Sequence, residues 1–213
     1  VTAWNGVKPY EVTRTNNPKV RALPTYRTVS INGVEHQVVD FGEWFSAFTG
    51  SPADTCTASA IPLDSIVASE FYGVVADTDA KGRTVLGFGY KNALTAPDKY
   101  PFRRDGAKIL NAAKTDSTAS LVNGSIFVDG ASATADYAPG LNEFHVYGFV
   151  PTQAVTVNAI AAGYYDGFGG VQVGELVAFS GANTSARQQA IRRVLQRKWL
   201  GSGSYLQLPL SDV

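Results

Sequence analysis

The residues with the clearest chemical potential form a cluster of aromatic and acidic side chains in a glycine-rich turn. This cluster contains Tyr164, Tyr165, Asp166 and Phe168. Successive side chains of a strand point to opposite faces, so one of the two adjacent tyrosines must point outward. Aromatic rings pack on the apolar C–H faces of sugars, while carboxylates accept hydrogen bonds from sugar hydroxyls. The cluster is therefore a candidate carbohydrate-binding site.

A second group of residues with similar chemistry precedes it in the chain. Its aromatic rings could stack on a sugar, and its charged groups could take the hydroxyls. For each aromatic taken alone, packing in a core or between strands is the more common role. For Arg103, the alternative is a solvated surface pair with Arg104. The group consists of Tyr90, Tyr100, Phe102, Arg103 and Asp105.

Catalytic constellations are not evident in the sequence. A retaining glycosidase needs two carboxylates about 5–5.5 Å apart across the scissile bond, but Glu143 and Glu175 each stand alone. Glu175 is expected to accept hydrogen bonds from the backbone or from an arginine of the C-terminal helix. His36 and His145 lie in strand patterns without acidic or cysteine partners at metal-ligand spacing, which favours packing over general-base chemistry for His145. We therefore predict a protein that is not an enzyme.

Residues 77–82 begin like a calcium-binding loop, with two aspartates and a threonine. An EF-hand loop needs an oxygen ligand at its fifth position and a glutamate at its twelfth. Lys81 and Phe88 occupy those positions. A turn between two strands explains the segment better, and the sequence assigns no calcium ligands elsewhere.

Short strands separated by turns must position these groups. Asn32-Gly33 between two alternating runs in residues 26–41 predicts a β-hairpin, because both central residues of such a turn favour positive φ. Asn123-Gly124 predicts a second hairpin turn. About ten short strands at this spacing indicate an antiparallel sandwich or barrel. The further strands are expected in residues 71–78, 84–90, 143–150, 154–165 and 170–179.

One amphipathic helix is predicted near the C-terminus. Ser185 and Gln188 have the spacing of a capping box, and Gly201 is a typical C-terminal stop. Four basic residues gather towards the C-terminal half, where they complement the helix dipole and are expected on a solvated face: Arg192, Arg193, Arg197 and Lys198. The apolar stripe expected to face a sheet comprises Ala190, Ile191, Val194, Leu195 and Trp199.

Composition bounds the classes of function. The 213 residues carry 18 basic and 18 acidic side chains, so no broad positive field favours nucleic acid. No apolar run approaches the ~20 residues of a membrane-spanning helix, which predicts no membrane insertion. The single Cys56 cannot form an intramolecular disulfide. A start at Val1, with neither initiator Met nor signal peptide, indicates an excised or mature domain.

The order of these motifs resembles the laminin-G-like, concanavalin A-like domains of bacterial surface and secreted proteins. In that family, a strand carrying Gly-Glu runs into a helix that ends in Lys-Trp, as do Gly174-Glu175 and Lys198-Trp199 here. The hairpins around Asn32-Gly33 and in residues 122–130 are also similar to family motifs. Asn183 departs from the pattern, because the family usually has Leu ahead of the helix, and this removes a small packing contact.

The resemblance implies an all-β, concanavalin A-like jelly-roll sandwich of two antiparallel sheets with one C-terminal helix, in a single domain spanning residues 1–213. Domains of this kind most often bind glycans or serve as non-catalytic adhesive modules, which implies an extracellular or cell-surface location. The alternative is a structural or protein-interaction domain of a larger surface or phage-tail protein, and a glycan-cleaving enzyme is less favoured. Related domains often hold calcium. The same sandwich hosts several functions, so the fold alone does not decide among them.

Overall fold

The computed structural model describes residues 24–43, 45–46, 61–79, 102, 107–110, 112, 118–161 and 167–201. These residues form short strands and two helices, so the predicted predominance of β-structure and the late helix are confirmed. The elements are β1 (Thr25–Ile31), β2 (Val34–Asp40), β3 (Phe45–Ser46), β4 (Ile61–Ala68), β5 (Glu70–Asp77), α1 (Thr118–Val122), β6 (Ser125–Val128), β7 (Ala131–Ala133), β8 (Phe144–Val150), β9 (Val155–Ile160), β10 (Gly167–Phe168), β11 (Val171–Phe179) and α2 (Ser185–Leu200).

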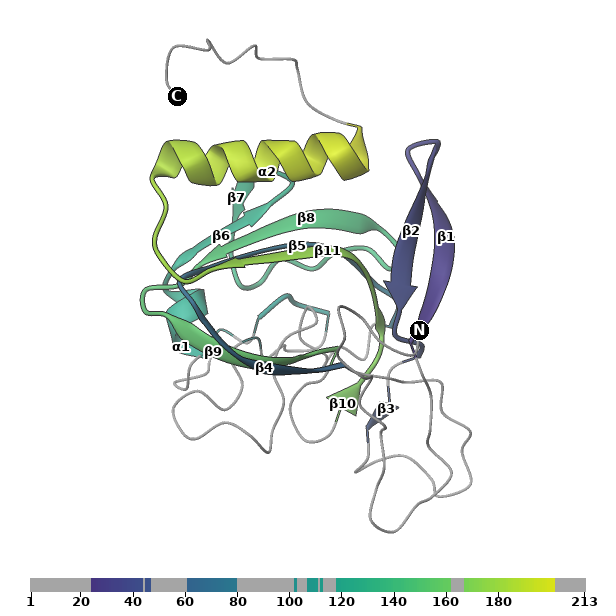
Figure 1. Ribbon diagram of the computed structural model, residues 1–213, viewed down its shortest axis with the longest axis horizontal. Helices are drawn as coiled ribbons and strands as arrows, with labels where there is room; N and C mark the ends of the chain where they lie inside the picture. Colours follow the sequence, from purple (N-terminus) through teal and green to yellow (C-terminus); the bar gives the residue numbers. More distant parts are fainter. Residues whose placement is uncertain are drawn as a thin grey trace.

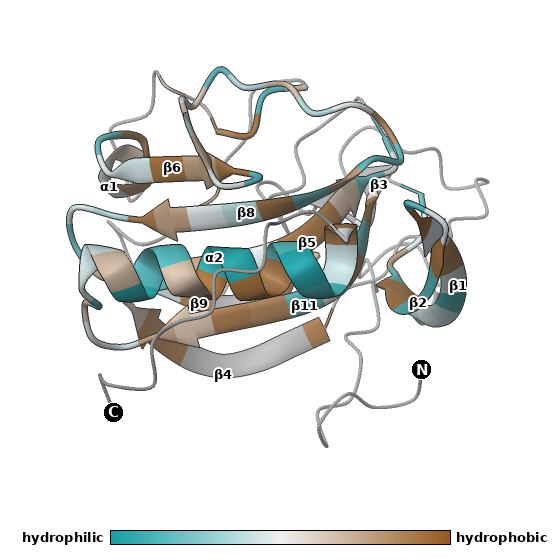
Figure 2. Ribbon diagram, turned by 90° about the horizontal axis from the view of Figure 1, so that it is seen from above, coloured by the Kyte–Doolittle hydropathy of each residue, from teal (hydrophilic) through white to brown (hydrophobic). Residues whose placement is uncertain are grey.

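The strands pair into one large sheet and two small ones. The large sheet has seven strands in the order β1-β2-β11-β5-β8-β6-β7, and β4–β9 and β10–β3 form two-stranded sheets. The paired strands of these sheets are antiparallel. Helix α2 covers one face of the large sheet and β4–β9 lie under the other face (Figure 1). Seen from above, α2 runs along β5, with β8 and β11 on either side (Figure 2).

Strand β5 separates two hydrophobic cores, and all of its residues are buried. Phe71 and Val75 belong to the inter-sheet core, whereas Tyr72 and Val74 belong to the helix-side core. This alternation follows from the two-residue period of a strand. The inter-sheet core also contains Ile61, Val155, Val157 and Ile160 from the β4–β9 sheet. The helix-side core also contains Val146, Leu195 and Trp199.

One predicted hairpin is confirmed and the other is wrong. Asn32 and Gly33 have φ values of 50° and 83° and connect β1 to β2, with Ile31 opposite Val34. Asn123 instead follows helix α1, where its backbone N–H donates to the carbonyl of Ala119. The second turn lies at Asp129-Gly130, with φ values of 49° and 81°, between β6 and β7. Asp-Gly satisfies the same positive-φ requirement as Asn-Gly.

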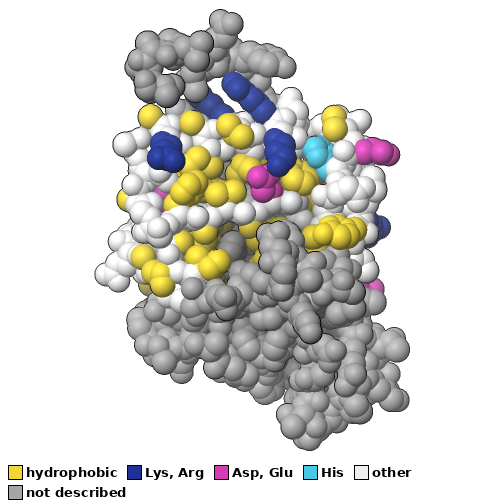
Figure 3. Space-filling model, in the orientation of Figure 1, with side chains coloured by type: hydrophobic (Ala, Val, Ile, Leu, Met, Phe, Trp, Pro, Cys, Tyr) yellow, Lys and Arg dark blue, Asp and Glu magenta, His cyan; other side chains and the backbone are white. Residues whose placement is uncertain are grey.

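Helix α2 begins at Ser185, the residue that was predicted to be its N-cap. The N-cap is Thr184, whose side chain accepts from the backbone N–H of Arg187, and Gly201 closes the helix at φ 61°. The predicted role of Ser185 as the cap is therefore wrong, and that of Gly201 is confirmed. Within the predicted stripe, Leu195 and Trp199 are buried, whereas Val194 is 61 % exposed. Several Lys and Arg side chains lie at the level of this helix (Figure 3).

Candidate functional site

Most residues of the two predicted aromatic groups lie outside the described residues: Tyr90, Tyr100, Arg103, Asp105, Tyr164, Tyr165 and Asp166. Phe168 lies in β10, opposite Phe45 of β3. Phe102 is fully buried, and its ring makes T-shaped contacts with Phe71 and Phe149, with both pairs of centroids 5.2 Å apart. Core packing therefore accounts for Phe102, whose ring has no face open to a ligand.

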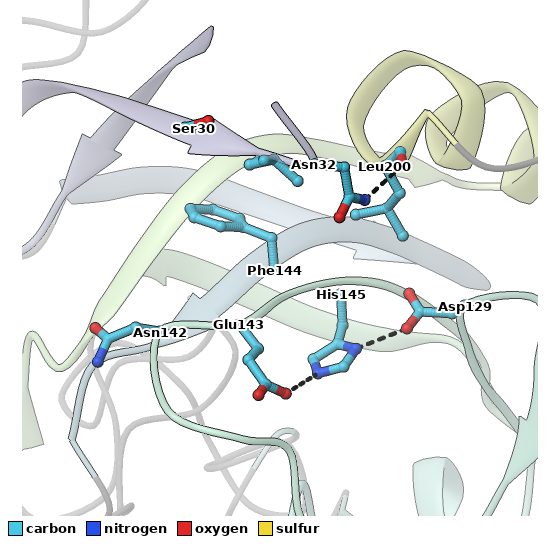
Figure 4. A pocket seen from close by; sticks show the side chains of 9 residues that line it. Ser30, Asn32, Asp129, Asn142, Glu143, Phe144, His145 and Leu200 are labelled. Carbon is cyan, nitrogen blue, oxygen red and sulfur yellow. Dashed lines mark hydrogen bonds and ion pairs between the residues drawn. The ribbon is translucent and has the colours of Figure 1, made fainter. Parts of the chain in front are cut away.

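A pocket of about 390 Å³ lies elsewhere, where four segments meet. These segments are the β1–β2 turn, the end of α2, the β6–β7 turn and the start of β8 (Figure 4). Its volume falls within the ~300–1,000 Å³ range of small-molecule sites. The pocket is lined by Ser30, Ile31, Asn32, Asp129, Asn142, Glu143, Phe144, His145 and Leu200.

His145 is the most constrained polar group of the pocket. Its Nδ1 lies 2.7 Å from Oδ2 of Asp129, and Oδ1 of Asp129 accepts from the backbone N–H of Val146 at 2.8 Å. An ionised carboxylate only accepts, so Nδ1 of His145 is the donor. This hydrogen bond raises the pKa of His145 above its usual value. Burial opposes the rise, and the charges of Asp129, Glu143 and Asp77 add to it.

Glu143 brings a second carboxylate to the same ring. It stands two residues before His145, just ahead of the first residue of β8. Oε2 of Glu143 lies 3.8 Å from Nε2 of His145, and the Glu143 side chain is 67 % exposed. Gly140 makes room for this carboxylate, because a Cβ atom there would lie 2.3 Å from Oε2 of Glu143. The sequence shows no acidic partner of His145 at metal-ligand spacing, and the structure adds that two carboxylates lie beside its ring.

Amide and apolar groups complete the pocket. The side chain of Asn32 donates to the carbonyl of Leu200 at 2.7 Å, which ties the β1–β2 turn to the end of α2. Asn142 has φ 60°, and its backbone N–H donates to the carbonyl of Asp77. Ile31, Phe144 and Leu200 supply apolar surface. The pocket thus combines several orienting polar groups with an apolar wall, the usual composition of a small-molecule site.

The acid–base groups of the pocket are held mainly by one another. Both carboxylate oxygens of Asp129 are engaged, one by His145 and one by Val146. Ser30 is the one hydroxyl side chain among the described lining residues, and it makes no hydrogen bond to His145, whose Nδ1 is bonded to Asp129 and whose Nε2 has no hydrogen-bond partner among the described residues. A nucleophile is recognised by such a hydrogen bond to its base. The described part of the pocket therefore holds a charged hydrogen-bonding centre rather than a recognisable nucleophile–base pair.

We expect Asp129→Asn to lower the pKa of His145 towards its usual value of about 6.5. Asparagine tolerates the positive φ of this position and can still accept from the Val146 N–H, so the turn should persist. Because the folded-state pKa is raised, the wild-type interaction stabilises the fold below the unfolded-state pKa. This stability is lost as the pH rises through the folded-state value. NMR titration of the His145 ring measures the shift, with the exposed Glu35→Gln as the control. An unchanged titration would contradict the assignment.

A buried polar network lies under the start of α2. Glu70 is fully buried and accepts from the Tyr72 hydroxyl, the backbone and side-chain N–H groups of Asn183, and the Gln188 side chain, at 2.6–2.9 Å. Arg192, also buried, lies 3.6 Å above the centroid of the Phe127 ring. Asn183, where the sequence indicates only a lost packing contact, therefore anchors the helix. Arg192 is not on the solvated face predicted for it.

Glu175 has partners other than those predicted for it. It accepts from Nζ of Lys198 at 2.7 Å and from Nε1 of Trp199 at 2.8 Å. Burial raises the pKa of Glu175, but these hydrogen bonds and the charge of Lys198 outweigh it, so the pKa lies below the usual value. Glu175 is thereby committed to holding the end of α2.

Comparison with known proteins gives no identity: no family model, curated protein or solved structure matches the chain. Among the described residues, none of the helices has the length and apolarity to cross a membrane. In the same part of the chain, no three His, Cys, Asp or Glu residues come together as a metal site. Of the calcium-like segment, Asp77, Thr78 and Asp79 are described, and Thr78 donates its backbone N–H to the carbonyl of Gly170.

Proposed function

We propose that this protein is a non-catalytic, extracellular carbohydrate-binding or adhesive module, built as a concanavalin A-like jelly roll of the laminin-G-like type. Antiparallel sheets packed across a common core, with a single late helix, are consistent with this fold. The observation that carries the functional proposal is the pocket around His145. It offers hydrogen-bond donors and acceptors beside apolar surface. Sugars present a matching combination of hydroxyls and apolar C–H faces.

Each part of the pocket has a role in this proposal. Phe144 and Leu200 offer apolar surface to a sugar ring. The Asn142 amide and the Glu143 carboxylate take the hydroxyls, because neither is engaged by a hydrogen bond in the described part of the chain. Asp129 does not touch the ligand and instead orients the His145 ring. The predicted aromatic groups outside the described residues remain candidates for extending the site.

A structural or protein-interaction domain of a larger surface or phage-tail protein is the second candidate. Strand β1 favours it, because it forms an edge of the large sheet and most of its residues are exposed. Tyr26 on this strand is 63 % exposed. Such an edge offers unpaired backbone groups to an added strand. A glycan-cleaving enzyme is less favoured, since both oxygens of Asp129 are already engaged.

Binding to a glycan array, with and without calcium, tests the proposal. For a glycan that the wild type binds, we expect Asn142→Gly to weaken affinity about three- to ten-fold, the worth of one neutral hydrogen bond. Glycine keeps the positive φ of this position. His145→Gln should also weaken affinity, because it removes the ring that Asp129 holds in the pocket wall. Val67→Ala, at an exposed position of β4, is the control.

Two results would count against carbohydrate binding. The first is that no glycan binds in either calcium condition. The second is that glycans bind but both pocket variants retain wild-type affinity, which would move the site elsewhere. If the chain binds a protein partner, and Tyr26→Ala disrupts that binding while the pocket variants do not, the second candidate is favoured.

A further inference from the structure

The described lining of the pocket carries negative charge without a permanent cation to balance it. It contains Asp129 and Glu143, and none of its nine residues is Lys or Arg. His145 contributes at most one positive charge. Against the two carboxylates, the net charge of the lining therefore stays negative whether or not His145 is protonated. Negatively charged groups are repelled from such a site, and positively charged groups are attracted to it.

The two carboxylates have different tasks. Asp129 is committed through both oxygens to His145 and Val146. Glu143 lies 3.8 Å from the His145 ring, which is longer than a hydrogen bond, and its side chain points to the ring from the pocket wall (Figure 4). Its oxygens are therefore the ones that an incoming donor can reach.

We infer that the pocket selects glycans that carry a free, protonated amino group, and that Glu143 is the specificity-determining residue. This inference rests on the proposed carbohydrate binding. An ammonium group donates hydrogen bonds to a carboxylate with charge assistance, which makes them roughly twice as strong as neutral ones. An N-acetylated sugar lacks that charge, and a uronic acid brings a charge of the wrong sign. Glu143 thus discriminates among these sugars by their charge. The Asn142 amide and the apolar side chains of the pocket do not distinguish between them.

The test compares three oligosaccharides of equal length by calorimetry near pH 6: the hexamers of glucosamine, N-acetylglucosamine and galacturonic acid. We expect the glucosamine hexamer to bind about three- to five-fold more tightly than the N-acetylated one, the contribution of an exposed ion pair, and the galacturonate hexamer to bind most weakly. Raising the salt concentration should reduce the preference, because Glu143 is largely exposed and its charge is screened.

Two variants assign the preference to Glu143. Glu143→Gln removes the charge and keeps the shape, so it should bring the preference close to unity, because affinity for the glucosamine hexamer falls more than affinity for the N-acetylated hexamer. Gly140→Ala retains the charge but pushes the carboxylate away, because the added Cβ would overlap its oxygens, and should also reduce the preference. Asp136→Asn is the control, since it removes one acidic charge from a residue that does not line the pocket.

The outcomes separate this inference from the proposed function. If all the neutral and amino sugars bind equally, or the galacturonate hexamer binds best, selection for an amine is wrong while carbohydrate binding stands. If the preference survives both Glu143→Gln and Gly140→Ala, Glu143 is not its source. If no glycan of the array or of this series binds, carbohydrate binding fails and the selectivity fails with it.

Discussion

Replacing Glu70 with glutamine is expected to lower the free energy of unfolding by about 3–5 kcal/mol, the cost of removing one partner from a buried charged network. Glu70 accepts four hydrogen bonds, from Tyr72, Asn183 and Gln188. Glutamine has one acceptor oxygen, so its amide group would face donors, and buried donors left without acceptors are costly. The buried Arg192 would also lose the nearby negative charge. Chemical denaturation measures the loss.

The stability of the wild type should also depend on pH through Glu70. Burial raises the pKa of this carboxyl, but the hydrogen bonds from Asn183, Gln188 and Tyr72 together outweigh it, so the pKa lies below its usual value. A carboxylate with a lowered pKa stabilises the fold above the unfolded-state value of about 4.3. That stability is lost as the pH falls through the folded-state pKa. The unfolding free energy of Glu70→Gln should therefore vary less with pH in the acid range.

Glu35→Gln is the matched control for this prediction. It makes the same chemical change at an exposed position of β2, where surface substitutions usually shift stability by less than about 0.5 kcal/mol. Equal denaturation midpoints for the two variants would contradict the assigned importance of the buried network. A large loss for Glu70→Gln with unchanged acid dependence would mean that the hydrogen-bond geometry matters and the charge does not.

Local patterns predicted the fold where neighbouring residues decide the outcome. Positive φ at Asn32-Gly33 depends on two residues, and the αL stop at Gly201 depends on one, so both were predictable. The error at Asn123-Gly124 has the same origin, because Asp129-Gly130 satisfies the same rule a few residues later. Only the pairing of β6 with both β7 and β8 selects the second turn, and such pairing is not a local property.

The polar sites could not be predicted in the same way. Glu70 and Asn183 are 113 positions apart, so no spacing rule joins them. For His145, a partial signal was present, since Glu143 lies two residues away in the sequence and Asp129 lies in a turn next to the partner strand. Recognising it requires the register that places Val128 opposite Tyr147. The burial of Phe102 likewise depends on Phe71 and Phe149, which belong to different strands.

The second large effect is expected at Gly174, where an alanine should cost about 2–3 kcal/mol, towards the upper end for overpacking a core. A Cβ atom here would lie 2.6 Å from two atoms of the Trp199 ring. The ring has little freedom to retreat. Its Nε1 donates to Glu175 at 2.8 Å, and its centroid lies 4.7 Å from that of the stacked His36 ring. Thermal and chemical unfolding measure the cost.

Gly181→Ala is the control, since a Cβ atom at Gly181 would have no atom within 4 Å, and we expect little change in stability. A double-mutant cycle then identifies the cause. In a Trp199→Leu background the ring is absent, so Gly174→Ala should cost much less than it does in the wild type, and the two effects should not add. Additive effects would show that the backbone bulge at Gly174, between Val173 and Glu175, is the source of the cost. If the ring is the source, displacing Trp199 also moves the adjacent Leu200, so Gly174→Ala should weaken ligand binding in the pocket as well.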